Sequence, residues 1–343
     1  MGNPVSPIKI RVYQDWLGEG PERQWPACPP EEYSDIEFRF GGHGKADYVF
    51  ILNDVRNTVL VNCDPDRVWG FIQEPPSELH AELQIGRPYF SRVYTTDETL
   101  PPPRYIQYWS GLKWATGLSY DEMRSANYPE KTMDLSWVTS NLTLLTGHQK
   151  RMNFLKDLQL GIPDLALFGR GFKPIARKWD ALAPARYSIA FENYSGGIYW
   201  SEKITDCFLS YATPIYHGSR DIDRYFPKGS YINIDPEKSG TIEFVKEIIS
   251  SDFHEINLDA LLEARELCLK QYNTLFFLAD LAKDHYKRNG EPQITFWQKL
   301  TPAHPNPVWK RAIGQLRNLA IEILPRGLTQ FARTMKHRLL SRS

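Results

Sequence analysis

The stretch from residue 187 to residue 203 constrains this chain more than any other. An apolar run that predicts a strand leads into an acid and an amide, and a Ser-Gly-Gly turn then opens a helix with a carboxylate and an ammonium in its first turn. The free N–H groups of that helix N-terminus, together with Lys203, are expected to face phosphate groups. Glu192, Asn193 and Glu202 are expected to hold sugar hydroxyls. The stretch is typical of a nucleotide-sugar site and favours a glycosyltransferase.

Length and composition indicate two globular domains. The chain has 343 residues, of which 42% are hydrophobic, and its formal net charge of zero disfavours binding of nucleic acid by the whole protein. Aromatic residues make up 13%, which fits either stacking on sugar rings or ordinary packing. The four cysteines form no CxxC pair, so the sequence predicts neither a zinc site nor a redox motif. Since no signal peptide and no membrane-spanning run is apparent, we expect a soluble, cytoplasmic protein.

Glu74 is the candidate of greatest interest in the N-terminal part. Short apolar runs there predict strands of an α/β sheet over residues 8–13, 48–52, 58–63, 68–72 and 91–95. Glu74 follows the fourth run, and Pro75 keeps it out of helical geometry. Because open α/β sheets bind ligands at the carboxyl ends of their strands, Glu74 is a candidate site residue. The alternative is a solvated loop glutamate.

A second set of alternating strands and helices begins near residue 135 and indicates a second doubly wound domain. Its predicted strands cover residues 135–141, 164–168, 187–191, 214–216 and 231–234, and its predicted helices cover 147–159, 202–213, 240–250 and 258–287. We therefore expect three parts. They are an α/β domain over 1–134, an α/β domain over 135–290 and a basic amphipathic helical tail over 291–343.

The tail from residue 304 onwards differs from the rest of the chain. It holds eight Lys or Arg residues against one acid, and its apolar residues recur at helical spacing. Two basic amphipathic helices of this kind would lie on an anionic membrane surface, which would place the protein on the inner face of a membrane. The alternative is a helix pair that packs on the body of the protein with its charges in solvent.

Several segments resemble the α-1,3/4-fucosyltransferases of glycosyltransferase family 10. The segment Tyr199-Trp200-Ser201-Glu202-Lys203 is similar to the family's Tyr-x-Thr-Glu-Lys motif, with serine in place of threonine. The segments 71–76, 136–141, 187–193 and 214–219, together with Arg151, resemble further family segments. The resemblance implies two facing Rossmann-like domains of the GT-B type, with the acceptor on the first and GDP-fucose on the second. It also implies inversion at the sugar and neither a catalytic metal nor another cofactor.

The resemblance also implies roles for single residues. Glu74 would be the catalytic base that takes the proton of the acceptor hydroxyl. Lys203 and Arg151 would stabilise the charge on the departing GDP, whereas Glu202 would hold hydroxyls because a second anion beside the diphosphate would be repelled. The other predicted donor-site residues are Asn141, Gly169, Arg170, Glu192, Asn193 and Tyr199.

Three functions stay open at this stage. The first is transfer of fucose from GDP-fucose to a Gal/GlcNAc-type glycan, in an α-1,3 linkage. The second is a transferase that uses another GDP-sugar, and the third is a non-catalytic protein that binds a glycan or nucleotide on the same scaffold. The presence of Glu74, Arg151 and Lys203 favours an enzyme. Residues 1–60 and 95–130 do not match the family clearly, so the acceptor stays open.

Overall fold

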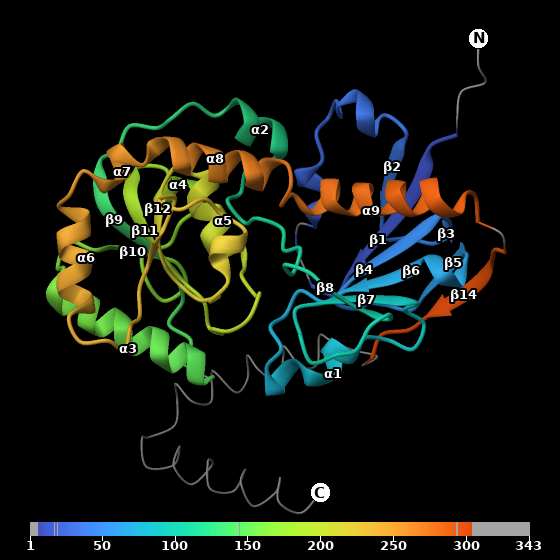
Figure 1. Ribbon diagram of the computed structural model, residues 1–343, viewed down its shortest axis with the longest axis horizontal. Helices are drawn as coiled ribbons and strands as arrows, with labels where there is room; N and C mark the ends of the chain where they lie inside the picture. The colour runs from blue at the N-terminus through green and yellow to red at the C-terminus, as the bar shows by residue number, and fades with distance from the viewer. Residues whose placement is uncertain (1–5, 17, 19, 144, 293, 304–343) are drawn as a thin grey trace, which may run out of the picture.

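The computed structural model describes residues 6–303 except 17, 19, 144 and 293, and it shows two α/β domains side by side (Figure 1). The first domain contains a sheet of six parallel strands in the order β2-β1-β4-β6-β7-β8. These strands are β1 (Ile8–Gln14), β2 (Ile36–Phe40), β4 (Tyr48–Leu52), β6 (Val68–Phe71), β7 (Arg92–Thr95) and β8 (Tyr105–Gln107).

The second domain contains a sheet of five parallel strands in the order β10-β9-β11-β12-β13. These strands are β9 (Met133–Val138), β10 (Ala166–Phe168), β11 (Ala185–Phe191), β12 (Thr213–His217) and β13 (Ile232–Asn233). Helices α3 (Thr146–Gly161) and α6 (Thr241–Ile249) pack on one face, and α5 (Glu202–Leu209) and α8 (Leu258–Leu269) pack on the other. Two parallel sheets covered by helices confirm the predicted pair of Rossmann-like domains.

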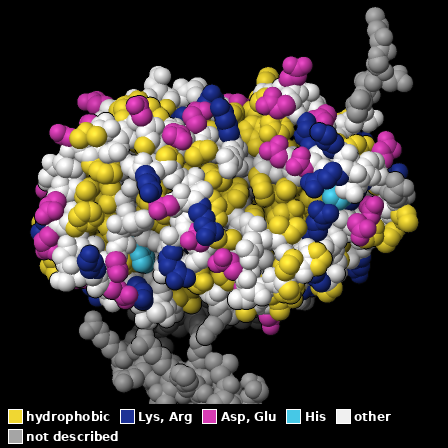
Figure 2. Space-filling model, viewed as in Figure 1, with side chains coloured by type: hydrophobic (Ala, Val, Ile, Leu, Met, Phe, Trp, Pro, Cys, Tyr) yellow, Lys and Arg dark blue, Asp and Glu magenta, His cyan; other side chains and the backbone are white. Residues whose placement is uncertain are grey.

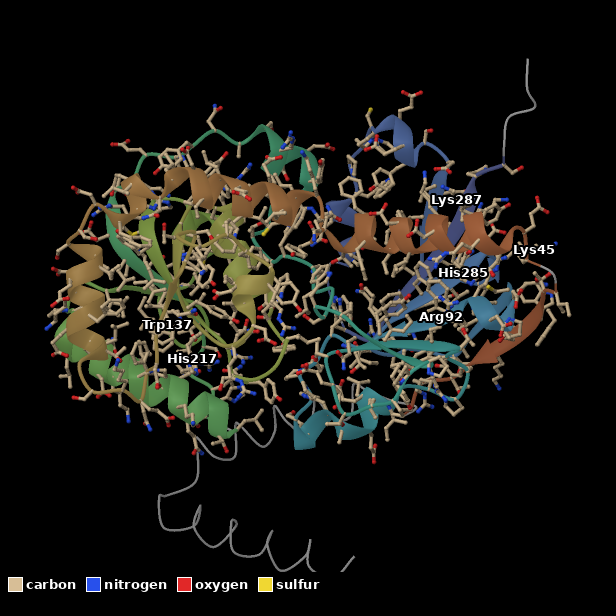
Figure 3. The ribbon with its side chains drawn as sticks, viewed as in Figure 1. Lys45, Arg92, Trp137, His217, His285 and Lys287 are labelled. Atoms are coloured by element: carbon tan, nitrogen blue, oxygen red, sulfur yellow. The ribbon has the colours of Figure 1, made fainter. Side chains whose placement is uncertain are left out.

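Short elements complete the fold. They are the α-helices α1 (Ala81–Ile85), α2 (Tyr120–Ser125), α4 (Trp179–Leu182) and α7 (Phe253–Ile256), and 3₁₀ turns at Pro21–Gln24, Glu31–Tyr33, Pro65–Arg67, Glu78–His80 and Ile222–Arg224. Large aromatic side chains fill both cores, such as Trp69 in the first domain and Trp137 in the second. Figure 3 labels Trp137 within the second domain. Charged side chains of both signs are scattered over the face shown in Figure 2, in keeping with the zero net charge.

One predicted strand lies outside the main sheet. β5 (Val59–Cys63) pairs with β3 (Gly44–Lys45) and, antiparallel, with β14 (Phe296–Leu300) in a separate three-stranded sheet. Buried and accessible residues alternate along β5, which suits a sheet with one solvated face rather than a buried parallel strand. β14 also falls within the range predicted as a helical tail, so that prediction is wrong for residues 296–300.

The predicted helix over residues 258–287 is two helices, α8 and α9 (Thr274–Asn289). Asn273 caps α9, because its side-chain oxygen accepts hydrogen bonds from the backbone N–H groups of Leu275 and Phe276. Leu275 and Leu278 then pack into the core of the first sheet, across which α9 lies in Figure 1. The domain boundaries stay a prediction, but α9 packs on the first sheet although it falls within the range assigned to the second domain.

Two sequence expectations concern contact with a membrane. The basic amphipathic segment 304–343 lies outside the described residues. Among the residues that the structure does describe, none of the helices combines the length and the hydrophobicity needed to span a lipid bilayer.

We predict that Asn273→Ala destabilises the docking of α9. Asn273 is fully buried, and its amide nitrogen also donates to the carbonyl of Gln24 at 2.9 Å. Loss of a buried cap is expected to cost about 1–3 kcal/mol and to lower the urea midpoint of unfolding. Asn289→Ala, at the exposed end of the same helix, is the matched control. Equal midpoints for the two variants would contradict the assignment of Asn273 as the cap that holds α9.

Candidate functional site

A cleft of about 1030 Å³ lies between the two domains. Its walls are formed by Gln73, Glu74, Pro75, Ser77, Leu79, His80, Leu112, Leu145, Thr146, Gly147, His148, Glu192, Asn193, Tyr194, Tyr199, Glu202 and Lys203. Six predicted site residues are among them: Glu74 from the first domain, and Glu192, Asn193, Tyr199, Glu202 and Lys203 from the second. The fold therefore brings the predicted base and most of the predicted donor residues to one cavity.

The second domain contributes to the cleft at the point where its sheet reverses its winding. From β9 the sheet extends to β10 on one side and to β11 on the other. Such a switch point opens a crevice at the carboxyl ends of the two strands, where α/β proteins bind ligands. Glu192 and Asn193 directly follow β11, and Ser140 comes shortly after β9.

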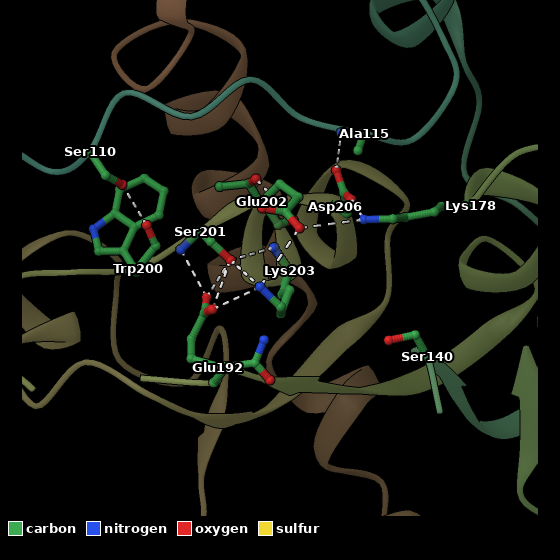
Figure 4. A network of polar contacts seen from close by, with 12 residues as sticks. Ser110, Ala115, Ser140, Lys178, Glu192, Trp200, Ser201, Glu202, Lys203 and Asp206 are labelled. Atoms are coloured by element: carbon green, nitrogen blue, oxygen red, sulfur yellow. Dashed lines mark hydrogen bonds and ion pairs between the residues drawn. The ribbon is translucent and has the colours of Figure 1, made fainter. Parts of the chain in front are cut away.

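Glu192 is buried at the end of β11, and its carboxylate organises the start of α5 (Figure 4). Ser201 donates to it from its backbone N–H, at 2.8 Å to Oε1, and from its hydroxyl, at 2.6 Å to the same oxygen. Nζ of Lys203 lies 3.0 Å from Oε2 of Glu192 and 2.8 Å from Oγ of Ser201. One buried carboxylate thus fixes the position of the Lys203 ammonium group.

This arrangement differs from what the sequence predicts for Glu192 and for the N-terminus of α5. Glu192 was expected to hold sugar hydroxyls, but its two oxygens are already hydrogen-bonded within the protein. The N-terminus of α5 was expected to present free N–H groups to phosphate, but the Glu192 carboxylate lies there and Ser201 is the N-cap. Ser201 caps the helix by accepting the N–H of Lys203 at 3.4 Å, and the ammonium group of Lys203 lines the cleft.

Two carboxylates hold Lys203 in its charged form. Burial alone would lower the pKa of Lys203, but the charges of Glu192 and Glu202 outweigh it and raise the pKa above its usual value. The ammonium side chain is 28% exposed, so it is anchored from behind and accessible from the cleft. A fixed, partly dehydrated cation of this kind is suited to an anionic ligand.

Glu202 lies between two lysines and is ionised. Its Oε1 is 3.7 Å from Nζ of Lys203 and 3.8 Å from Nζ of Lys178. Burial opposes ionisation of this carboxyl, but the two ammonium charges outweigh it and lower the pKa of Glu202 to about 2. Lys178 is held in turn by Asp206 at 2.7 Å. Glu202 lines the cleft, and its two carboxylate oxygens are hydrogen-bond acceptors that suit the predicted contact with hydroxyls.

Arg151 lies behind the cleft wall. Its Nη1 donates to Oδ1 of Asn193 at 2.6 Å, and its Nη2 donates to the carbonyl of Ser140 at 3.0 Å. The side chain is 4% exposed and is not among the residues that form the wall. Arg151 therefore links the loops that follow β9 and β11 and orients Asn193 in this structure.

The N-terminus of α3 forms part of the cleft wall, which the sequence analysis did not foresee. Thr146, Gly147 and His148 are its first residues and all line the cleft. A Cβ atom on Gly147 would collide with the backbone of Asn193, so only glycine allows this close approach. Burial first, and then the charges of Arg151 and Lys203, lower the pKa of His148, which indicates that this end of the cleft is electropositive.

Glu74 stands on the opposite wall, at the carboxyl edge of the first sheet. It follows β6, and its backbone carbonyl accepts a hydrogen bond from the Gln84 side chain at 2.9 Å. Its Oε2 lies 3.7 Å from Nε2 of His80, whose Nδ1 is 3.1 Å from Oγ of Ser77. With a side chain that is 45% exposed, Glu74 is accessible to a ligand in the cleft.

Tyr199 lines the cleft, and its hydroxyl is influenced by carboxylates on both walls. It is buried, and its ring packs edge-on against Tyr194 with the ring centroids 6.0 Å apart. Burial raises the pKa of Tyr199 well above its usual value, and the charges of Glu192, Glu202 and Glu74 add to the increase. Its hydroxyl is therefore neutral and lies within the field of carboxylates from both domains.

Besides Arg151, the predicted donor residues Asn141, Gly169 and Arg170 are not part of the cleft wall. The backbone N–H of Asn141 donates to the carbonyl of Arg170 at 3.1 Å, and the backbone N–H of Gly169 donates to the carbonyl of Lys173 at 2.9 Å. Asn141 and Arg170 are exposed, in loops that follow β9 and β10. Their roles in binding the donor stay predictions.

No group of three or more His, Cys, Asp or Glu side chains suited to a metal ion occurs within the described part of the chain. The glutamates that line the cleft, Glu74, Glu192 and Glu202, lie beside lysine, serine or histidine side chains.

Known proteins match parts of this chain. Residues 128–249 match the family described as Glycosyltransferase family 10 (fucosyltransferase) C-term. The Alpha-(1,3)-fucosyltransferase FucT of Helicobacter pylori is 31% identical over 74 residues, a match that covers 21% of this chain and 16% of that relative. The matched part is thus a small fraction of that relative's length.

Solved structures of transferases are also similar. The crystal structure of an alpha1,3-fucosyltransferase with GDP is 17% identical, and the match covers 90% of this chain and 95% of that one with a TM-score of 0.48. The crystal structure of an alpha1,3-fucosyltransferase with GDP-fucose is 16% identical, and the match covers 84% of this chain and 93% of that one with a TM-score of 0.47. The T4 phage BGT in complex with UDP-glucose is 9% identical, covers 79% of this chain and 99% of its own, and has a TM-score of 0.42. Likeness at this level carries over neither a ligand nor an activity. Residues 128–249 are thus similar to the C-terminal domain of glycosyltransferase family 10, the fucosyltransferase family, and that match covers only this part of the chain.

Proposed function

We propose that this protein transfers fucose from GDP-fucose to a hydroxyl group of a glycan, with inversion at the sugar and without a metal ion. The observation that carries the proposal is one cleft with a fixed cation, Lys203, on one wall and an accessible carboxylate, Glu74, on the other. The family of residues 128–249 supports fucose as the transferred sugar. The named relative supports an α-1,3 linkage, since its printed name specifies that linkage.

The donor end of the cleft has the charge that a nucleoside diphosphate needs. Negative charge grows on GDP as the glycosidic bond breaks, and Lys203 is placed to stabilise it because Glu192 and Ser201 hold its ammonium group in advance. The N-terminus of α3 at Thr146 adds a second electropositive group on the same wall. Glu202 would accept hydrogen bonds from hydroxyls of ribose or fucose.

The opposite wall has the group that a one-step inversion needs. The acceptor oxygen must attack from the side opposite the leaving GDP, and a base on that side must take its proton. Glu74 is that base in our proposal, and His80, 3.7 Å away, would orient its carboxylate. Leu79, His80 and Leu112 line the cleft beside Glu74 and would contact the acceptor, for which we propose a glycan of the Gal/GlcNAc type.

We also propose a cytoplasmic location, with residues 304–343 in contact with the inner face of an anionic membrane. The support for this proposal is the sequence pattern of that segment, in which basic residues outnumber acids and apolar residues recur at helical spacing.

The function is tested directly by incubating the protein with labelled GDP-fucose and a panel of Gal/GlcNAc-type acceptors, with and without a chelator. We expect transfer to at least one acceptor at the same rate in both conditions, and slower or no transfer from GDP-mannose. Neither transfer nor slow hydrolysis of GDP-fucose would contradict the enzyme proposal. Loss of activity with the chelator would contradict its metal-free part, and preference for GDP-mannose would favour another GDP-sugar as donor.

Glu74→Gln should separate catalysis from donor binding. Loss of a general base is expected to lower kcat by about 10²–10⁴-fold, while the dissociation constant for GDP stays near that of the unchanged protein because Glu74 lies on the other wall. Calorimetry with GDP and steady-state kinetics measure the two quantities. Glu82→Gln, an exposed carboxylate in the same domain, is the matched control and should change neither. Parallel loss of GDP binding and activity in Glu74→Gln would refute its role as base.

A further inference from the structure

A second polar cavity lies at the opposite edge of the first sheet. It holds about 450 Å³ and is lined by Asp64, Asp66, Arg67, Ser91, Arg92, His285 and Asn289. Arg67 precedes β6 and Arg92 begins β7, so the cavity is at the amino ends of these strands, whereas Glu74 follows the carboxyl end of β6. Figure 3 shows Arg92 and His285 together in the first domain, beside α9 and away from His217 of the second domain. The cavity is therefore separate from the cleft.

Arg67 carries a buried donor without a partner. The side chain is 3% exposed and packs over the rings of Tyr48 and Tyr286, with its Cζ 5.0 Å and 5.7 Å from their centroids. Its Nη2 donates to the carbonyl of Gly290 at 2.6 Å. Its Nη1 is buried and has no hydrogen-bond partner among the described residues. A buried guanidinium N–H without an acceptor lowers the stability of the folded protein, unless a ligand accepts its hydrogen bond.

Arg92 places a second guanidinium at the same cavity. Its Cζ lies 4.6 Å from the centroid of the Trp69 ring, over which it stacks. Within the described part of the chain, neither Arg92 nor Arg67 makes an ion pair with an Asp or Glu side chain at 4.0 Å or less. Two guanidinium groups that share a cavity repel each other, and an anion between them would relieve the repulsion.

His285 supplies a further donor. Its Nδ1 is 2.9 Å from the hydroxyl of Tyr48, and if the tyrosine donates, the imidazole proton lies on Nε2. Burial first, and then the charges of Arg92, Arg67 and Arg288, lower the pKa of His285 to about 4, while Asp64 acts in the opposite direction. The imidazole is therefore neutral at pH 7 and lies in a positive field.

Two acids, Asp64 and Asp66, also line the cavity. Oδ1 of Asp64 accepts the backbone N–H of Asp66, at 3.0 Å, as the cap of a 3₁₀ turn. Asp66 is exposed, and its backbone carbonyl accepts the hydroxyl of Ser91 at 2.8 Å and the indole N–H of Trp69 at 2.9 Å. The acids thus share the cavity with the donors of Arg67, Arg92 and His285.

We propose that this cavity binds a phosphate group. Arg67 Nη1, the guanidinium of Arg92 and Nε2 of His285 would donate to its oxygens, since guanidinium groups match the geometry of phosphate and form charge-assisted hydrogen bonds with it. The phosphate is either a free anion or ester or the headgroup of an anionic lipid, and the two sources share this chemistry. The proposal concerns a site apart from the cleft and stands whether or not the protein transfers fucose.

The test is histidine NMR on the full chain, labelled at the imidazole carbons, with inorganic phosphate as the probe at constant ionic strength set by chloride. Eight histidines give few signals, and His285→Gln assigns the one of interest. We expect phosphate to shift the His285 signal in a saturable way and to raise its pKa, because the anion offsets the arginine charges. Arg92→Gln should raise the phosphate dissociation constant at that signal by about tenfold or more.

Matched controls separate this site from nonspecific charge effects and from the cleft. Arg104→Gln removes an arginine that also stacks on a ring, 5.6 Å from the centroid of Tyr105, but lies outside the cavity. Lys203→Met removes the cation of the cleft. Both variants should keep the His285 response. An unsaturable or absent response in the unchanged protein, or an equal response in Arg92→Gln, would overturn the proposal.

Vesicles distinguish the two sources of phosphate. If vesicles of phosphatidylcholine with phosphatidic acid bind the full chain and Arg92→Gln weakens that binding where Arg104→Gln does not, the site takes a lipid headgroup. If inorganic phosphate shifts the His285 signal but Arg92→Gln leaves vesicle binding unchanged, the site takes a soluble phosphate. Either result requires the saturable His285 response to inorganic phosphate, and the absence of that response contradicts a phosphate site of either kind.

Discussion

The site depends on one buried carboxylate. Glu192 ends β11 inside the protein and gathers the hydroxyl and N–H of Ser201 and the ammonium of Lys203 around its two oxygens. Removing one partner of such a buried pair typically costs about 3–5 kcal/mol, because the other charge is left uncompensated. The Glu192 interaction therefore determines both the direction in which α5 leaves the sheet and the position of Lys203 in the cleft. Without these contacts the Lys203 side chain would be ordered only when the ligand binds, and the lost conformational entropy would weaken binding.

The architecture divides the proposed reaction between two parallel sheets. Each sheet presents its carboxyl edge to the same cleft, so the donor groups and the base come from different domains and cannot neutralise each other in advance. Arg151 contributes from behind, because it ties the loops after β9 and β11 together through Ser140 and Asn193. α9, the last helix, packs on the first sheet and thus links the far end of the chain to the domain that carries Glu74.

Local chemistry explains which features could be predicted from the sequence. The strand, turn and helix around Glu192 and the placement of Glu74 after β6 follow from hydrophobic runs, glycines and Pro75, all of which act on their neighbours in the chain. The capture of the α5 N-terminus by Glu192 could not be predicted, because it depends on how residues nine apart meet in space. The α3 N-terminus in the cleft and the pairing of β5 with β14 depend on contacts even farther apart in sequence. Asn273 did carry a local signal, since Asn before an apolar run is a common N-cap.

The most direct measurement is the dissociation constant for GDP in a double-mutant cycle of Glu192 and Lys203, determined by calorimetry on variants whose thermal unfolding shows a folded protein. Lys203→Met should raise the dissociation constant by about 10–100-fold, the loss expected for a charge-assisted hydrogen bond. Glu192→Gln should also raise it, and the double variant should be no weaker than Lys203→Met alone, because Glu192 acts through Lys203. Unchanged GDP binding in Lys203→Met, or fully additive effects of the two substitutions, would contradict the central role of this pair.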